Sequence, residues 1–66
     1  MIDRINRILK EVKNVQALSF TNQGRDYLYW CLQNGYTLVI MVPSGASLSP
    51  SLEALVDAGL IVIENL

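Results

Sequence analysis

The sequence has no histidine and a single cysteine, Cys31. Without histidine there is no imidazole base, no Ser-His or Cys-His pair and no histidine ligand for a metal ion. One cysteine excludes an internal disulfide, a Cys-x-x-Cys redox pair and a thiolate zinc site, and a secreted domain this small normally needs such cross-links. We therefore predict no catalytic residues, no metal site and no cofactor, and we expect the reducing environment of the cytoplasm.

Charged residues are scarce, and long hydrophobic runs are missing. Only 17% of the 66 residues are charged, against about a quarter in typical soluble domains. The sequence nowhere contains the run of about 20 apolar residues that a membrane-spanning helix needs. Six of the first fourteen residues are charged, which excludes a secretory signal peptide. We expect no membrane span.

Basic residues are few and unevenly placed. Five Lys and Arg stand against six Asp and Glu, with a net charge of +2 over residues 1–14 and −3 over residues 15–66. Tight non-specific binding to nucleic acid depends on many contacts between phosphates and Lys or Arg. The composition therefore disfavours nucleic acid as a partner.

Apolar residues, by contrast, are abundant, at 52% of the chain. A chain of this length forms a single small domain, residues 1–66, and buries only about 60% of the surface that its unfolded form exposes. The apolar surplus cannot all be hidden inside one copy. We therefore expect a second buried surface, shared with another copy of the chain or with another protein.

Residues 3–13 are predicted to form a helix. Their apolar side chains recur at helical spacing, while the Lys and Arg side chains fall opposite. The apolar stripe consists of Ile2, Ile5, Ile8, Leu9 and Val12. Asp3 is a suitable N-cap for this helix, and Asn14 ends it.

The middle of the chain is predicted to form a three-strand meander over residues 15–20, 27–32 and 36–42. These segments are rich in β-branched and aromatic residues. The dipeptide Asn34-Gly35 between the last two is typical of a two-residue hairpin turn, because both residues tolerate a positive φ.

An alternative reading makes residues 22–34 a helix. Thr21 would then be its N-cap and Gly35 would end it. The chain would become an α/β protein of order α-β-α-β-α-β. We prefer the meander, because the segment Tyr27–Leu32 is richer in strand formers than in helix formers.

The last third of the chain carries clearer signals. Ser49 is a good N-cap, Pro50 suits the first position of a helix, and Gly59 stops the helix before an apolar strand at residues 60–63. With the strand at 36–42 this gives a βαβ unit. The predicted fold is therefore a single α+β domain of order α-β-β-β-α-β.

This element order resembles the core of the restriction-endonuclease-like enzymes. Those enzymes carry an acidic residue on the second strand and a Glu/Asp-x-Lys triplet on the third. Here Asp26, at the start of the second predicted strand, takes the place of the acid, but Leu38-Val39-Ile40 occupies the region of the triplet. The resemblance therefore implies the fold alone, and not nuclease activity.

The longest uncharged stretch indicates where a partner binds. Residues 27–52 contain no Asp, Glu, Lys or Arg, and the two predicted strands within them are apolar on both faces, so something must cover each face. We predict a small non-enzymatic binding or regulatory module that self-associates or binds another protein through a Tyr-rich sheet face. The candidate contact residues are Tyr27, Tyr29, Tyr36, Leu38 and Ile40.

Two further ligand classes remain as alternatives. The loop at residues 43–49 leads from a strand into a helix N-terminus, a place where backbone N–H groups can hold a phosphate; its candidate ligands are Ser44, Gly45, Ser47 and Ser49. The aromatic residues of the 27–36 segment could stack on nucleic-acid bases, but no Lys or Arg lies among them, so packing is the preferred interpretation. The sequence does not identify the partner.

Overall fold

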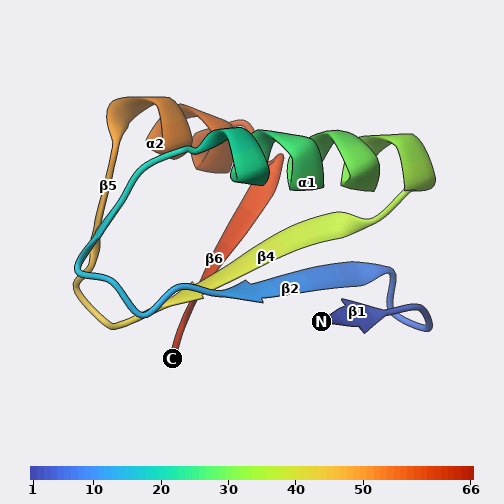
Figure 1. The fold of residues 1–66 in the computed structure, drawn as a ribbon, viewed down its shortest axis with the longest axis horizontal. Helices are drawn as coiled ribbons and strands as arrows, with labels where there is room; N and C mark the ends of the chain where they lie inside the picture. Colours follow the sequence, from blue (N-terminus) through green and yellow to red (C-terminus); the bar gives the residue numbers. More distant parts are fainter.

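A computed structural model of the chain describes all residues, 1–66, and contains two helices with six strands (Figure 1). In chain order the elements are β1 (Ile2–Asp3), β2 (Ile8–Val12), β3 (Ala17–Leu18), α1 (Asn22–Asn34), β4 (Thr37–Val42), β5 (Ser47–Leu48), α2 (Pro50–Asp57) and β6 (Ile61–Asn65). Neither helix is long and apolar enough to cross a membrane.

The main sheet has the strand order β1-β2-β4-β6. Strands β2, β4 and β6 run parallel, and β1 pairs with β2 in the antiparallel direction. Helix α1 connects β2 to β4 and α2 connects β4 to β6, and both helices lie on the same side of the sheet (Figure 1). The short strands β3 and β5 form a separate parallel pair beside the two layers.

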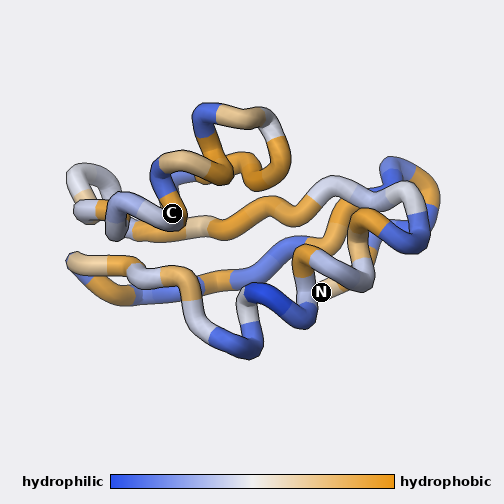
Figure 2. The backbone as a smooth tube through the Cα atoms, turned by 90° about the horizontal axis from the view of Figure 1, so that it is seen from above, coloured by the Kyte–Doolittle hydropathy of each residue, from blue (hydrophilic) through white to orange (hydrophobic).

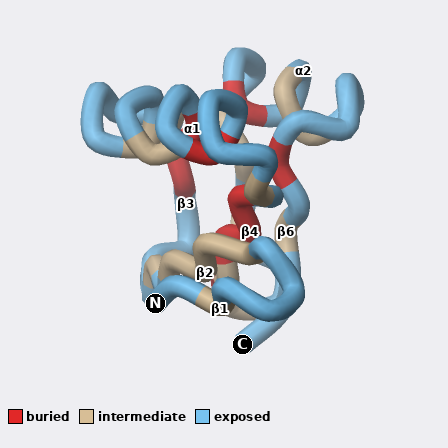
Figure 3. Tube along the Cα trace, turned by 90° about the vertical axis from the view of Figure 1, so that its right-hand side faces the viewer, coloured by how far each residue is buried: buried red, intermediate tan, exposed pale blue.

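The core lies between the helices and the sheet, where Figure 3 shows the buried residues. Because side chains alternate along a strand, β4 directs every second residue toward the helices. Strand β4 is hydrophobic along most of its length, as the orange strand through the middle of Figure 2 shows. The buried cluster consists of Leu18, Leu28, Cys31, Leu38, Ile40, Val42, Leu52 and Ile61.

The α+β class is confirmed, but the helix predicted at residues 3–13 is wrong. This segment forms the β1–β2 hairpin, and the carboxylate of Asp3 accepts hydrogen bonds from the N–H groups of Ile5 and Asn6 at its turn. The hydrogen bonds from Asn6 hold the pKa of Asp3 below its usual value. Strand β2 pairs along its whole length with β4, and this long-range pairing overrides the local helical spacing.

The predicted meander is also wrong, and the alternative with residues 22–34 as a helix is correct. The hydroxyl of Thr21 caps α1 by accepting a hydrogen bond from the N–H of Gly24, at 3.1 Å. Gly35 is not part of a hairpin turn; it adopts a left-handed conformation (φ 70°) and ends the helix. Burial of Leu28 and Cys31 against the sheet outweighs the strand propensity of their aromatic neighbours.

The βαβ unit predicted at the C-terminal end is confirmed. Pro50 is the first residue of α2, the hydroxyl of Ser49 accepts a hydrogen bond from the N–H of Leu52 at 3.3 Å, and Gly59 follows with a φ of 78°. These signals act locally, so the sequence alone determines the ends of this helix.

Replacement of Ser49 by Ala is expected to lower the free energy of unfolding by about 1 kcal/mol, because one helix N–H loses its capping acceptor. Urea denaturation followed by circular dichroism measures the change. Ser44→Ala is the matched control, since Ser44 is exposed and lies outside the helix. Equal losses in the two variants would contradict the capping role.

Candidate functional site

Strand β2 carries an acidic residue, Glu11, next to its last position, and a lysine, Lys13, follows directly after the strand, so that only Val12 separates the two. In an extended chain such residues point to the same face of the sheet. Lys13 Nζ lies 3.6 Å from Glu11 Oε1. The backbone N–H of Lys13 donates to the carbonyl of Met41 at 2.8 Å, which fixes this end of β2 beside β4.

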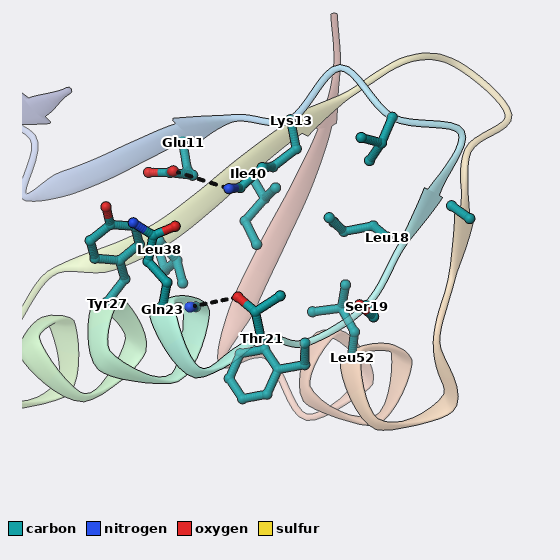
Figure 4. A pocket seen from close by; sticks show the side chains of 14 residues that line it. Glu11, Lys13, Leu18, Ser19, Thr21, Gln23, Tyr27, Leu38, Ile40 and Leu52 are labelled. Atoms are coloured by element: carbon teal, nitrogen blue, oxygen red, sulfur yellow. Dashed lines mark hydrogen bonds and ion pairs between the residues drawn. The ribbon is translucent and has the colours of Figure 1, made fainter.

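The pair lies in a cavity of about 240 Å³ between the sheet and the start of α1 (Figure 4). Glu11 and Lys13 are the only charged residues in its wall. The remaining lining residues are Val15, Ala17, Leu18, Ser19, Phe20, Thr21, Gln23, Gly24, Tyr27, Leu38, Ile40 and Leu52. An apolar cavity with a few converging polar groups is the usual form of a ligand site.

Helix α1 adds two polar side chains to this cavity, Gln23 and Tyr27 (Figure 4). They are four residues apart and therefore share one face of the helix. The Thr21 cap sets the start of α1, and so places the first turn, which carries Gln23, opposite the end of β2. The cavity thus combines a carboxylate, an ammonium group, an amide and a phenol.

The Glu11–Lys13 pair stays accessible to a ligand, with exposed side-chain fractions of 22% and 36%. A second pair, Lys10–Glu64, has the same 3.6 Å separation. Strand alternation puts Lys10 on the opposite face of the sheet from Glu11, where no helix lies. The two pairs have the same chemistry, but only Glu11–Lys13 lies in the cavity.

The oxygen donors of the cavity suit a hard cation such as Mg²⁺. Glu11 supplies the carboxylate and Gln23 an amide oxygen. No group of three or more His, Cys, Asp or Glu side chains forms a complete metal cage in the structure. Mg²⁺ is commonly held by one or two carboxylates together with water and the phosphates of a substrate, so the residues present fit a cation that the substrate helps to bind.

The five residues predicted to form a Tyr-rich contact face do not lie on one face of the structure. Tyr27 and Tyr29 are on α1, and Tyr36 lies in the turn before β4. Leu38 and Ile40 are buried under the helices, where they line the Glu11–Lys13 cavity. Tyr27 and these two β4 residues line the cavity together, and Tyr36 packs against the same buried cluster.

The polar groups of the predicted phosphate loop have other roles. The backbone N–H and hydroxyl of Ser47 both point to the carbonyl of Gln16, at 2.8 and 3.4 Å. Ser49 caps α2, and Gly45 is a left-handed turn residue (φ 82°). Ser44 makes no side-chain hydrogen bond and lies exposed beside that turn. The loop therefore serves β3–β5 pairing and helix capping.

Sequence reasoning missed Glu11, Lys13 and Gln23. The acid-x-Lys signal is visible in the sequence, but it falls in the segment predicted to be a helix, whereas the region compared with the triplet is Leu38-Val39-Ile40, which lacks it. Asp26, the predicted acid, is on α1 and does not line the cavity. Asp3 pairs with Ile8 and so faces away from Glu11.

The family model described as restriction endonuclease fold toxin 7 (Tox-REase-7) matches residues 1–52, a range that includes β2, α1 and β4. Searches of curated proteins and of solved structures return no match.

Proposed function

We propose that this chain, which belongs to the restriction endonuclease fold toxin 7 family, cleaves phosphodiester bonds of nucleic acid at the Glu11–Lys13 cavity. The observation that carries the proposal is the acid-x-Lys triplet, which runs from the end of β2 into the next residue and brings both charged side chains to one cavity. Restriction-endonuclease-like enzymes carry a Glu/Asp-x-Lys triplet, and from the sequence alone we expect none in this chain. Glu11-Val12-Lys13 is such a triplet. The family match supports endonuclease activity independently of the geometry, but it does not identify the site.

The family match overturns the functional predictions made from the sequence. A non-enzymatic binding module is wrong, because the matched family is one of toxins with an endonuclease fold. The alternative of a phosphate-binding loop at residues 43–49 is overturned by the same finding. The prediction failed because the meander placed the third strand at residues 36–42, where Leu38-Val39-Ile40 stands in the region of the triplet, whereas the acid-x-Lys triplet is Glu11-Val12-Lys13, in the segment predicted to be a helix.

In this proposal the two charged residues have distinct roles. The Lys13 ammonium group binds the phosphate and neutralises the negative charge that grows on its oxygens as the attacking oxygen approaches. The Glu11 carboxylate orients the attacking water and provides the anionic ligand for a divalent cation. When bound there, Mg²⁺ supplies positive charge at the phosphate and makes a coordinated water more acidic. Gln23 positions the phosphate or the water by hydrogen bonding.

The low number of basic residues led us to expect no nucleic-acid partner. That expectation applies to tight non-specific binding, which needs many basic residues. Turnover needs only local contacts, and the net charge of +2 over residues 1–14 falls on the segment that carries Lys13. The charge distribution therefore supports a transient substrate complex rather than a tight one.

The remaining expectations about location and assembly stay predictions. We propose that the chain acts in the cytoplasm, where nucleic acid is available.

Cys31 is a free, buried thiol, and burial raises its pKa, so it takes no part in the proposed chemistry. Self-association through an apolar surface is compatible with the exposed side chains of Tyr29 and Leu32.

Replacement of Lys13 by Gln is expected to lower the rate of cleavage by on the order of 100-fold, because the phosphate loses its positive partner. Initial rates on end-labelled DNA and RNA, each as single strands and as duplexes, measure this. Lys10→Gln is the matched control, since it removes a lysine with the same ion-pair distance from the other face of the sheet. Equal rates in the two variants, or no cleavage by the folded wild-type chain, would overturn the proposed function.

A further inference from the structure

A second hollow lies next to the Glu11–Lys13 cavity, a groove of about 360 Å³ between α1 and the β1–β2 hairpin. Its lining residues are Ile2, Leu9, Asp26, Tyr27 and Trp30. Tyr27 lines both hollows, so that one tyrosine ring separates the groove from the charged pair. A ligand bound at the charged pair can therefore extend into the groove.

We propose that this groove, which we name the Trp30 groove, binds the base of an unpaired nucleotide next to the phosphate that is cleaved. The inference rests on the proposed function and adds to it the substrate class, single-stranded nucleic acid. A base inside a duplex is paired and stacked on both sides, so only an unpaired or extruded base can enter a groove of this kind.

Trp30 provides the stacking surface. Its side chain is 39% exposed, and the ring of Tyr36 packs beside it with a centroid distance of 4.9 Å and an interplanar angle of 59°. This contact restrains the indole ring before any ligand arrives, which reduces the entropy lost on binding. Stacking on a tryptophan suits every base, because each base has a flat aromatic face.

The groove favours a base over a phosphate. Four of its five lining residues are hydrophobic, and the fifth is the carboxylate of Asp26. With no basic residue in its wall, the groove repels the phosphate backbone, whereas Lys13 attracts it on the other side of Tyr27. The carboxylate of Asp26 can still accept a hydrogen bond from an amino group on the edge of a base.

Trp30 is the only tryptophan in the chain, so its fluorescence reports directly on this groove. The Glu11→Gln variant, which keeps the groove and slows cleavage, is titrated with single-stranded oligo(dT) and oligo(U) and with a duplex of equal length. Saturable quenching by at least one single strand, and none by the duplex, is expected. Absence of quenching by both single strands, or equal quenching by the duplex, would overturn the proposal.

Abasic oligonucleotides separate stacking from a merely structural role of Trp30. In the Glu11→Gln background, the abasic strand is expected to bind about tenfold more weakly than oligo(dT). Trp30→Leu should remove this difference, Trp30→Phe should largely restore it, and Tyr29→Leu, on the outer side of α1, should leave it unchanged. A difference that persists in Trp30→Leu would overturn the base-binding groove. Loss of cleavage in Lys13→Gln is measured separately, so the two proposals can fail independently.

Discussion

Replacement of Glu11 by Gln is expected to reduce the cleavage of nucleic acid by on the order of 100-fold or more, with no loss of stability. Glutamine keeps the shape of the side chain and removes its charge, so the cavity loses its anionic oxygen ligand. The ion pair with Lys13 is partly exposed, and such pairs contribute little to folding. The measurements are initial rates with Mg²⁺ present and thermal denaturation of the same samples.

Glu64→Gln is the matched control for this prediction. Glu64 pairs with Lys10 at the same 3.6 Å distance as Glu11 with Lys13, but outside the cavity. The control variant should keep the wild-type rate within about twofold, a margin typical of surface changes away from a site. If both variants lost activity equally, the charge of the whole chain rather than the cavity would be responsible.

Replacement of Leu52 by Ala is expected to remove a large part of the free energy of unfolding. Leu52 is 1% exposed and joins α2 to the buried cluster. A buried Leu→Ala change costs about 2–5 kcal/mol, and a domain of this size is stable by only about 3–10 kcal/mol. Urea denaturation followed by circular dichroism gives the free energy of unfolding.

Leu32→Ala makes the same substitution at an exposed helical position. Leu32 is 55% exposed on the outer side of α1. The free energy of unfolding of the Leu32→Ala variant should therefore differ from the wild-type value by less than about 0.5 kcal/mol. A large loss for Leu32→Ala would contradict the observed placement of the core between the helices and the sheet.

The C-terminal part of the fold could be predicted because its signals are local. A serine cap, a proline at the first helical position and a glycine stop lie within eleven residues, from Ser49 to Gly59. Each acts through its own backbone geometry, and the apolar runs on either side form the parallel strands β4 and β6.

The first half could not be predicted from local pattern alone. The apolar residues around β2 fit both a helix and a short strand, and the choice depends on pairing with β4, about 29 residues away at Ile8 and Thr37. For α1 the local pattern also favoured the wrong structure. Tyr29 and Trp30, two strand formers, stay partly exposed, while the helix buries Leu28 and Cys31.

The candidate site could not be predicted because residues 3–13 were expected to form a helix. In a helix, residues two apart differ by about 200° and point to opposite sides, so a helical segment separates Glu11 from Lys13. In strand β2 they share a face and meet. For Gln23 and Tyr27 the helix is needed: these residues are four apart, and helix α1 brings both to one side of the cavity.

The most direct test of the account is whether the purified wild-type chain cuts nucleic acid through Glu11. DNA and RNA, each as single strands and as duplexes, are incubated with the wild-type chain and with Glu11→Gln, in Mg²⁺ and in EDTA, and the products are resolved on denaturing gels. We expect the wild-type chain to cleave at least one of these substrates in Mg²⁺ only, and Glu11→Gln to leave it intact. A folded wild-type chain that cuts none of them, or a Glu11→Gln chain that cuts as fast, would contradict it.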